Sequence, residues 1–195
     1  FGMETRFDIH MGQRVEGQLG FDPEPASVIR SGGIQIDSRR VDLDGDGSEE
    51  IVVTSVDFGV GTIIRALLTR TVSLELGIYR MRDGVYPDRP VVTRKVIATV
   101  SLGEGYIFVP AILAADVDGD GRKDLLVQEG DDEIRIFAGI SGGELFAAKA
   151  DRVRVPLPRD REAFTVFDLN ADGREDLVMV MGERDEGKRI VTVTF

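Results

Sequence analysis

The sequence predicts an all-β protein with about three β-propeller-like blades of four antiparallel strands and one short helical insertion. Three observations lead to this prediction. An acidic nine-residue pattern, Asp-x-Asp/Asn-x-Asp-Gly-x-x-Asp/Glu, occurs at residues 42–50, 116–124 and 168–176. Short runs rich in apolar and β-branched residues flank each copy, as expected of strands. The copies start 74 and 52 residues apart, an interval that suits one sheet per repeat.

The strands of each predicted blade can be placed in order. In the first blade, approximately 33–100, strands are expected at 33–37, 51–56, 73–79 and 91–100. In the second, approximately 106–155, they are expected at 106–114, 125–127, 133–137 and 151–155. In the third, approximately 163–195, they are expected at 163–167, 177–181 and 189–195. Each acidic loop therefore joins the first and second strands of its sheet.

Two segments fall outside this rhythm. Residues 4–10 resemble a strand that could complete a blade. Residues 61–72 place Ile63, Ile64, Leu67 and Leu68 at helical spacing, which predicts a short amphipathic helix. This helix either caps its own blade or offers a docking surface to a partner.

Length and composition fit one globular domain over 1–195. The chain has 195 residues and is 42% hydrophobic, enough for a real core. Because it begins at Phe1 with no initiator Met or basic-then-apolar leader, we expect a processed product or a fragment. No apolar run is long enough to predict a membrane span. There is no cysteine, so disulfides and thiolate metal sites are excluded.

The three loops have the chemistry of calcium sites. Each carries side-chain oxygens at positions one, three, five and nine and a glycine at position six, where the chain must turn. Calcium accepts six to eight oxygen ligands at about 2.3–2.6 Å. The candidate side chains are Asp42, Asp44, Asp46 and Glu50; Asp116, Asp118, Asp120 and Asp124; and Asp168, Asn170, Asp172 and Asp176.

The charge of the chain is concentrated in these loops. The chain has 35 Asp and Glu against 24 Lys and Arg, a net charge of −11, and eleven of the acids are candidate ligands. The remaining charges balance. A generally acidic surface would not show this concentration, and nucleic-acid binding would need a basic patch.

The loops resemble those of the FG-GAP and VCBS repeats, which form integrin-like, calcium-binding β-propeller blades; residues 114–127 match that pattern at every defined position. The resemblance implies that position seven adds a backbone carbonyl to each site, from Ser48, Arg122 and Arg174. The chain departs from the pattern at Glu50, Asn170 and Ala171. Because fewer ligand charges weaken binding, the second site is predicted to be the tightest and the third the weakest.

Two other interpretations of the loops fit the sequence less well. An EF-hand needs a Glu at position twelve and helices on both sides. Position twelve is instead Val53, Val127 or Met179, each in a strand-like run. Acidic turns that bind no ion would leave the repulsion between as many as four carboxylates uncompensated.

No catalytic pattern is evident, so we predict a protein that is not an enzyme. The one histidine, His10, lies in a strand-like segment, and no nucleophile elbow or phosphate-binding loop is present. The alternative is an accessory or catalytic module of a carbohydrate-active enzyme, such as a polysaccharide lyase-like propeller. Having no Trp and three Tyr disfavours a sugar-stacking cleft.

The predicted role is an adhesion or protein-interaction scaffold. Three blades are fewer than the four to eight of most propellers, and unpaired sheet edges invite pairing with another chain. The expected partner is therefore a protein or a second copy, bound through open blade edges and 61–72, with carbohydrate as a further candidate. Weak calcium loops suit a calcium-rich compartment, so the expected location is extracellular, periplasmic or the cell surface.

Overall fold

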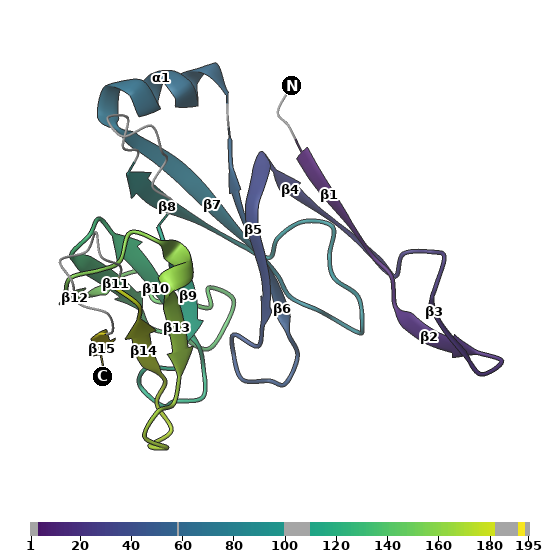
Figure 1. The fold of residues 1–195 in the computed structure, drawn as a ribbon. Helices are drawn as coiled ribbons and strands as arrows, with labels where there is room; N and C mark the ends of the chain where they lie inside the picture. The colour runs from purple at the N-terminus through teal and green to yellow at the C-terminus, as the bar shows by residue number, and fades with distance from the viewer. Residues whose placement is uncertain (1–3, 58, 100–109, 182–190, 194–195) are drawn as a thin grey trace. The chain divides into compact units, whose positions relative to one another are not determined.

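The computed structural model describes residues 4–57, 59–99, 110–181 and 191–193. Within them the chain is mostly β, with one α-helix and several small antiparallel sheets (Figure 1). Two sheets have four strands each, as propeller blades do. The chain divides into two compact units, which are described separately below: the first comprises 1–41, 48–64 and 73–96, and the second 42–47, 65–72 and 97–195.

The first unit begins with four short strands. Strand β1 (Glu4–Ile9) pairs antiparallel with β4 (Ser27–Gly32), and the hairpin of β2 (Gly12–Val15) and β3 (Gln18–Phe21) lies between them in sequence. The two-residue turn of this hairpin has positive φ at both residues, 51° and 87°, as a type I′ turn requires. The predicted strand at 4–10 is thus present, and in the described residues it forms a two-stranded sheet with β4.

The first four-stranded sheet has its strands in chain order, β5-β6-β7-β8. Its strands are β5 (Ile34–Val41), β6 (Glu50–Val56), β7 (Thr71–Tyr79) and β8 (Val92–Thr99). Helix α1 (Val60–Thr69) connects β6 to β7, where a short helix was predicted at 61–72. The helix buries none of its residues.

Two tyrosines in the core of the first unit link this sheet to neighbouring segments by hydrogen bonds. Tyr79 and Tyr86 pack in one buried cluster with Ile29 and Val53. The Tyr79 hydroxyl donates to a backbone carbonyl at 2.5 Å and the Tyr86 hydroxyl to another at 2.7 Å. Burial raises the pKa of both hydroxyls, so both remain protonated donors.

The second unit contains the other two blade-like sheets. Strands β9 (Ile112–Ala115), β10 (Asp124–Glu129), β11 (Glu133–Phe137) and β12 (Asp151–Arg154) form a four-stranded sheet in the order β12-β11-β10-β9. Residues 106–109 of the strand predicted at 106–114 lie outside the described residues.

The third sheet has three strands in the described part of the chain. After the 3-10 helix η1 (Arg161–Ala163) come β13 (Phe164–Phe167), β14 (Asp176–Met179) and β15 (Val191–Val193), with β14 in the centre. Of the strand predicted at 189–195, only 191–193 belongs to the described residues.

One apolar core joins the second and third sheets. The inner strand β10 is buried along nearly its whole length, which explains the apolar run at 125–127. Side chains from both sheets pack together in a single cluster. Its members are Ala111, Leu113, Ala115, Leu126, Ile134, Ile136, Leu157, Phe164, Leu177 and Met179. This packing holds the second and third acidic loops on one body.

Candidate metal centres in the acidic loops

The three acidic loops occupy the same position in three sheets. Each leaves the first strand of its sheet and returns as the second strand, so that the residue before position one pairs with position nine. The pairs are Val41 with Glu50, Ala115 with Asp124, and Phe167 with Asp176. An antiparallel junction of this kind brings the first and last candidate ligands of a loop together at its base.

Backbone N–H groups hold the side chain at position one in the same way in every loop. One oxygen of Asp42, Asp116 or Asp168 accepts from the glycine N–H at position six at 2.9 Å. The position-six glycines have φ between 85° and 89°, a conformation that side chains disfavour. The glycine is therefore required by the turn that aims this N–H at the carboxylate.

The second loop gathers three carboxylates. Oxygens of Asp116, Asp118 and Asp124 all lie within 4.8 Å of one another. Asp124 is 1% exposed, and its two oxygens accept from the N–H groups of Gly139 at 2.7 Å and Val117 at 2.9 Å. Burial raises the pKa of Asp124, although these two hydrogen bonds oppose the shift. A bound cation would compensate the cost of ionising this buried acid.

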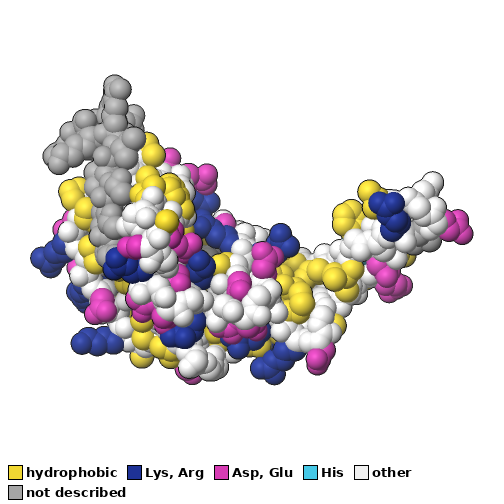
Figure 2. Space-filling view, turned by 90° about the horizontal axis from the view of Figure 1, so that it is seen from below, with side chains coloured by type: hydrophobic (Ala, Val, Ile, Leu, Met, Phe, Trp, Pro, Cys, Tyr) yellow, Lys and Arg dark blue, Asp and Glu magenta, His cyan; other side chains and the backbone are white. Residues whose placement is uncertain are grey.

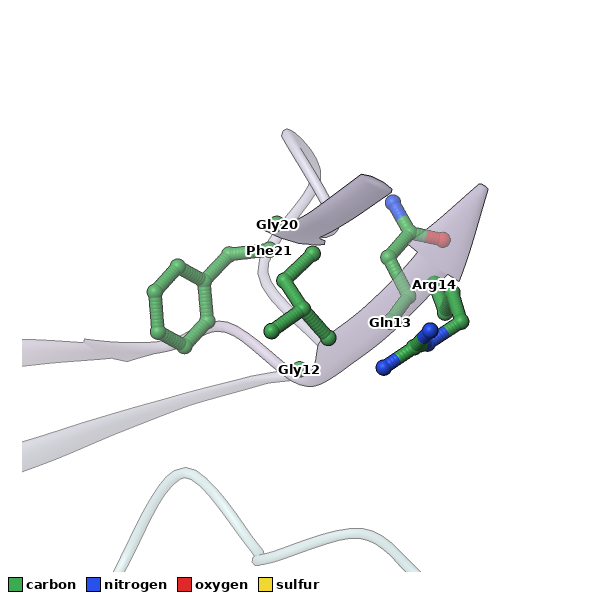
Figure 3. Close-up of a pocket in the computed structure, with 6 residues that line it drawn as sticks. Gly12, Gln13, Arg14, Gly20 and Phe21 are labelled. Carbon is green, nitrogen blue, oxygen red and sulfur yellow. The ribbon is translucent and has the colours of Figure 1, made fainter. Parts of the chain in front are cut away.

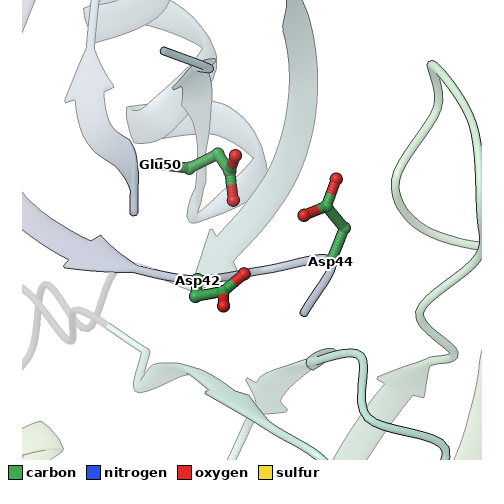
Figure 4. Close-up of side chains that lie close together, drawn as sticks. All are labelled: Asp42, Asp44 and Glu50. Atoms are coloured by element: carbon green, nitrogen blue, oxygen red, sulfur yellow. The ribbon is translucent and has the colours of Figure 1, made fainter. Parts of the chain in front are cut away.

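The first loop gathers an equivalent group. Oxygens of Asp42, Asp44 and Glu50 lie within 4.8 Å of one another, and the three carboxylates point toward a common space (Figure 4). Glu50 is fully buried on β6, and its Oε1 lies 3.4 Å from Nε of Arg80. The longer side chain at position nine therefore still reaches the cluster, and an arginine absent from the sequence prediction lies beside it.

The third loop differs. Its candidates do not form an equally close acidic group within the described residues. Asp168, Asn170 and Asp172 are exposed, whereas Asp176 is 2% exposed at the base of the loop. Ala171, which stands where the other loops have glycine, has φ of 60°. A neutral ligand and a strained backbone both distinguish this loop from the second.

Position five is engaged with position seven in two loops. Asp120 forms an ion pair with Arg122, and the Asp172 carboxylate accepts from Arg174 Nη2 at 2.5 Å. This hydrogen bond lowers the pKa of Asp172. The ligand roles predicted for Asp46, Asp120 and Asp172, and for the carbonyls of Ser48, Arg122 and Arg174, remain predictions.

The donor atoms of these clusters suit a hard cation. Carboxylate oxygens gathered on one loop are the ligands that calcium and magnesium prefer, and no softer nitrogen or sulfur ligand takes part in either acidic group. Positions one, three and nine of the first and second loops would hold the ion. The structure therefore provides two acidic groups that could bind a metal.

Comparison with known families places part of the chain. Residues 96–179 match the family model described as FG-GAP-like repeat. The chain carries an FG-GAP-like repeat over this range. The match includes the second and third loops and the strands on both sides of each, whereas the first loop lies before it. No curated protein matches the chain.

Other surfaces offer less chemistry than the loops. A shallow hollow on the β2–β3 hairpin contains no acidic side chain and is lined by Gly12, Gln13, Arg14, Leu19, Gly20 and Phe21 (Figure 3). Acidic and basic side chains are interspersed over the face shown in Figure 2. None of the helices in the described ranges is long and apolar enough to cross a membrane.

Proposed function

We propose that this chain is a calcium-binding, non-enzymatic repeat domain that serves as an extracellular or cell-surface scaffold for adhesion or protein association. The observation that carries the proposal is the recurrence of one acidic loop at one strand junction in three sheets. In this role calcium holds each loop closed, and the sheets present surfaces to a partner.

Calcium is favoured over other ions by the ligand set. The loops offer several carboxylate oxygens, and the third also an amide oxygen, as the larger coordination number of calcium requires. Magnesium demands a smaller and more regular octahedron. The raised pKa of Asp124 also fits a site in which a cation supports ionisation.

A structural role for calcium explains the distribution of charge. The chain carries −11 in total, and carboxylates crowded in loops repel one another unless a cation lies among them. Ligand binding to the folded state adds about 2.7 kcal/mol of stability per site when the free ion is a hundredfold above Kd. Three such sites would dominate the stability of a chain of this size.

The test is a calcium titration by calorimetry combined with thermal unfolding. We expect up to three ions to bind and the unfolding midpoint to rise by about 5 °C or more when calcium replaces a chelator. Magnesium at the same concentration should have a much smaller effect. A chain that binds no calcium at millimolar concentration, with an unfolding midpoint indifferent to the ion, would disprove the proposal.

The scaffold part of the proposal rests on the exposed apolar surface of helix α1. Helix α1 presents Val60, Ile63, Ile64, Leu67 and Leu68 at the spacing of one helical face, with exposures from 48% to 79%. Exposed apolar faces of this kind are typical of docking sites. We propose that this face and the open sheet edges bind a protein partner or a second copy of the chain.

Sedimentation of the calcium-loaded chain tests this surface. We expect self-association, or capture of a partner offered in purified form, to fall at least tenfold in the variant Leu67→Ser/Leu68→Ser. The variant Thr62→Ser/Thr69→Ser alters the same helix without changing its apolar face and serves as the control. Equal behaviour of the two variants would rule out α1 as the binding surface.

A further inference from the structure

The second and third acidic loops are joined by Glu175. This residue occupies position eight of the third loop, between Arg174 and the buried Asp176, and it is not itself a candidate ligand. Its Oε2 accepts from the backbone N–H of Asp116 at 2.7 Å and from Lys123 Nζ at 2.7 Å. Asp116 is position one of the second loop and Lys123 its position eight, so one carboxylate oxygen contacts both ends of the neighbouring loop.

A second hydrogen bond makes the contact reciprocal. The backbone N–H of Glu175 donates to the carbonyl of Asp116 at 2.7 Å. Both backbone groups of Asp116, a candidate ligand, are therefore fixed by one residue of the next loop. The Glu175 and Lys123 side chains are only 24% and 27% exposed, so water screens this ion pair less than an exposed one.

Close packing extends the contact along the loops. A Cβ added to Gly119, position four of the second loop, would lie 3.0 Å from Cγ of Arg174. Residues 174 and 175 of the third loop thus lie against positions one, four and eight of the second. Because the contact leaves little space, a shift in the backbone of either loop must displace atoms of the other.

We propose that Glu175 couples ion binding at the second and third loops, so that binding at one strengthens binding at the other. The inference rests on the calcium-binding function proposed above. An ion in the third loop fixes Asp172 to Asp176 and with them Glu175, which then holds Asp116 in place. The second ion meets a loop that is already partly ordered and loses less conformational freedom on binding. Glu175 acts as a positioning residue and makes no contact with the ion.

Repulsion between the two ions acts in the opposite direction. Salt at physiological ionic strength screens charges that lie more than about 8 Å apart. The hydrogen bonds through Glu175 are short-range and are not weakened in this way. Coupling should therefore be measured at about 150 mM NaCl, where charges more than about 8 Å apart are largely screened.

The experiment uses amide NMR signals that report on each loop separately. The N–H groups of Gly121 and Gly173 donate to Asp116 and Asp168 respectively, so their shifts follow calcium binding at the second and third loops. We compare the wild-type chain with a variant disabled in the third loop, Asp168→Asn/Asp172→Asn. Disabling the third loop should weaken calcium binding at the second loop, as followed by the Gly121 signal, about fivefold or more.

Substitutions of Glu175 test whether this residue carries the coupling between the two loops. In Glu175→Ala the second loop should bind calcium as weakly as it does when the third loop is disabled. Disabling the third loop in Glu175→Ala should then cause no further loss of calcium affinity at the second loop. Glu175→Gln should retain most of the coupling, because the amide oxygen still accepts from Asp116 N–H. Glu144→Gln removes one exposed carboxylate outside the acidic loops and should leave the coupling unchanged.

The results separate failure of this inference from failure of the proposed function. Loss of coupling in Glu175→Gln as complete as in Glu175→Ala, or full coupling in Glu175→Ala, would overturn the role of Glu175. Independent binding at the two loops of the wild-type chain would do the same while leaving calcium binding intact. No response of Gly121 or Gly173 to calcium would instead refute the function on which the inference rests.

Discussion

Ala171 shows how one residue can distinguish a loop from its copies. Position four of the loops has positive φ throughout: 75° at Gly45, 79° at Gly119 and 60° at Ala171. The left-handed conformation costs a residue with a Cβ about 1–2 kcal/mol. The third loop therefore keeps a turn that its sequence disfavours, and its backbone is strained where the other two are relaxed.

Replacing Ala171 with glycine should relieve this strain. We expect Ala171→Gly to raise the free energy of unfolding by about 1 kcal/mol and to tighten calcium binding at the third loop. Urea denaturation with and without calcium measures both effects. Ala114→Gly in β9, where φ is ordinary, serves as the control and should lose about 0.5–1 kcal/mol. Equal destabilisation by both substitutions would contradict the strain argument.

The burial of Asp124 predicts a pH dependence that calcium should remove. Its pKa in the folded chain is raised above the ordinary 3.8, chiefly by burial. The stability that this acid contributes to the metal-free protein is therefore fully present below about pH 3.8 and is lost as the pH rises through the raised pKa. Unfolding of dialysed, metal-free protein between pH 4 and 7 should show this loss, and Asp124→Asn should show less of it. If Asp124→Asn lost stability over this pH range as much as the wild-type chain does, Asp124 would not be the source of the pH dependence.

At the scale of elements, charges across neighbouring strands hold the second sheet together. Glu133 on β11 is 9% exposed and lies opposite Arg154 of β12 in the register of the sheet. Its carboxylate is 3.5–3.9 Å from the guanidinium nitrogens of three arginines, Arg135, Arg152 and Arg154. One buried acid thus contacts three arginines along the outer pair of strands, and Glu129 also pairs with Arg135.

Neutralising this acid should weaken the sheet. In Glu133→Gln the three guanidinium groups keep their mutual repulsion and lose their common partner, so we expect a loss of about 1–2 kcal/mol in unfolding free energy. Glu144→Gln, at an exposed position, is the matched control and should change stability by less than about 0.5 kcal/mol. Chemical denaturation of the two variants side by side makes the comparison. Similar losses in both would show that the buried network contributes nothing.

At the scale of the whole molecule, net charge is the property that the loops dominate. Eleven candidate ligands account for an excess of acid equal to the net charge of −11. Without a cation, this charge destabilises the folded chain through self-repulsion. Under the proposed function, each calcium ion would bring two positive charges to the place where the repulsion is greatest.

Salt should therefore stabilise the calcium-free chain more than the loaded one. Raising NaCl from about 0.02 M to 0.5 M shortens the screening length severalfold and weakens repulsion within the loops. We expect the unfolding midpoint of chelator-treated protein to rise by several degrees, while that of calcium-saturated protein stays nearly constant. Parallel thermal melts test this expectation. An equal salt response in both states would mean that loop repulsion has little influence on stability.

The sequence by itself determined the repeating unit of this protein. Strands at 51–56, 73–79 and 133–137 and a helix near 61–72 were predicted to within a few residues, because hydrophobic periodicity and turn residues act locally. The acidic clusters of the first and second loops were also predictable, since the candidate ligands at positions one and nine, eight residues apart in sequence, meet at the base of an antiparallel junction. The β2–β3 hairpin was missed, although Gly17 after Glu16 is a turn signal.

Only the tertiary structure decided which residues support the loops from outside. Glu175 contacts Asp116, which lies 59 residues earlier in the chain. The Gly139 N–H that donates to Asp124 comes from the segment after β11. Nothing in the local pattern marks either residue, because their roles depend on how one sheet packs beside the next and on how strands pair. Local chemistry therefore identified the candidate sites, whereas packing determined how two of them are linked.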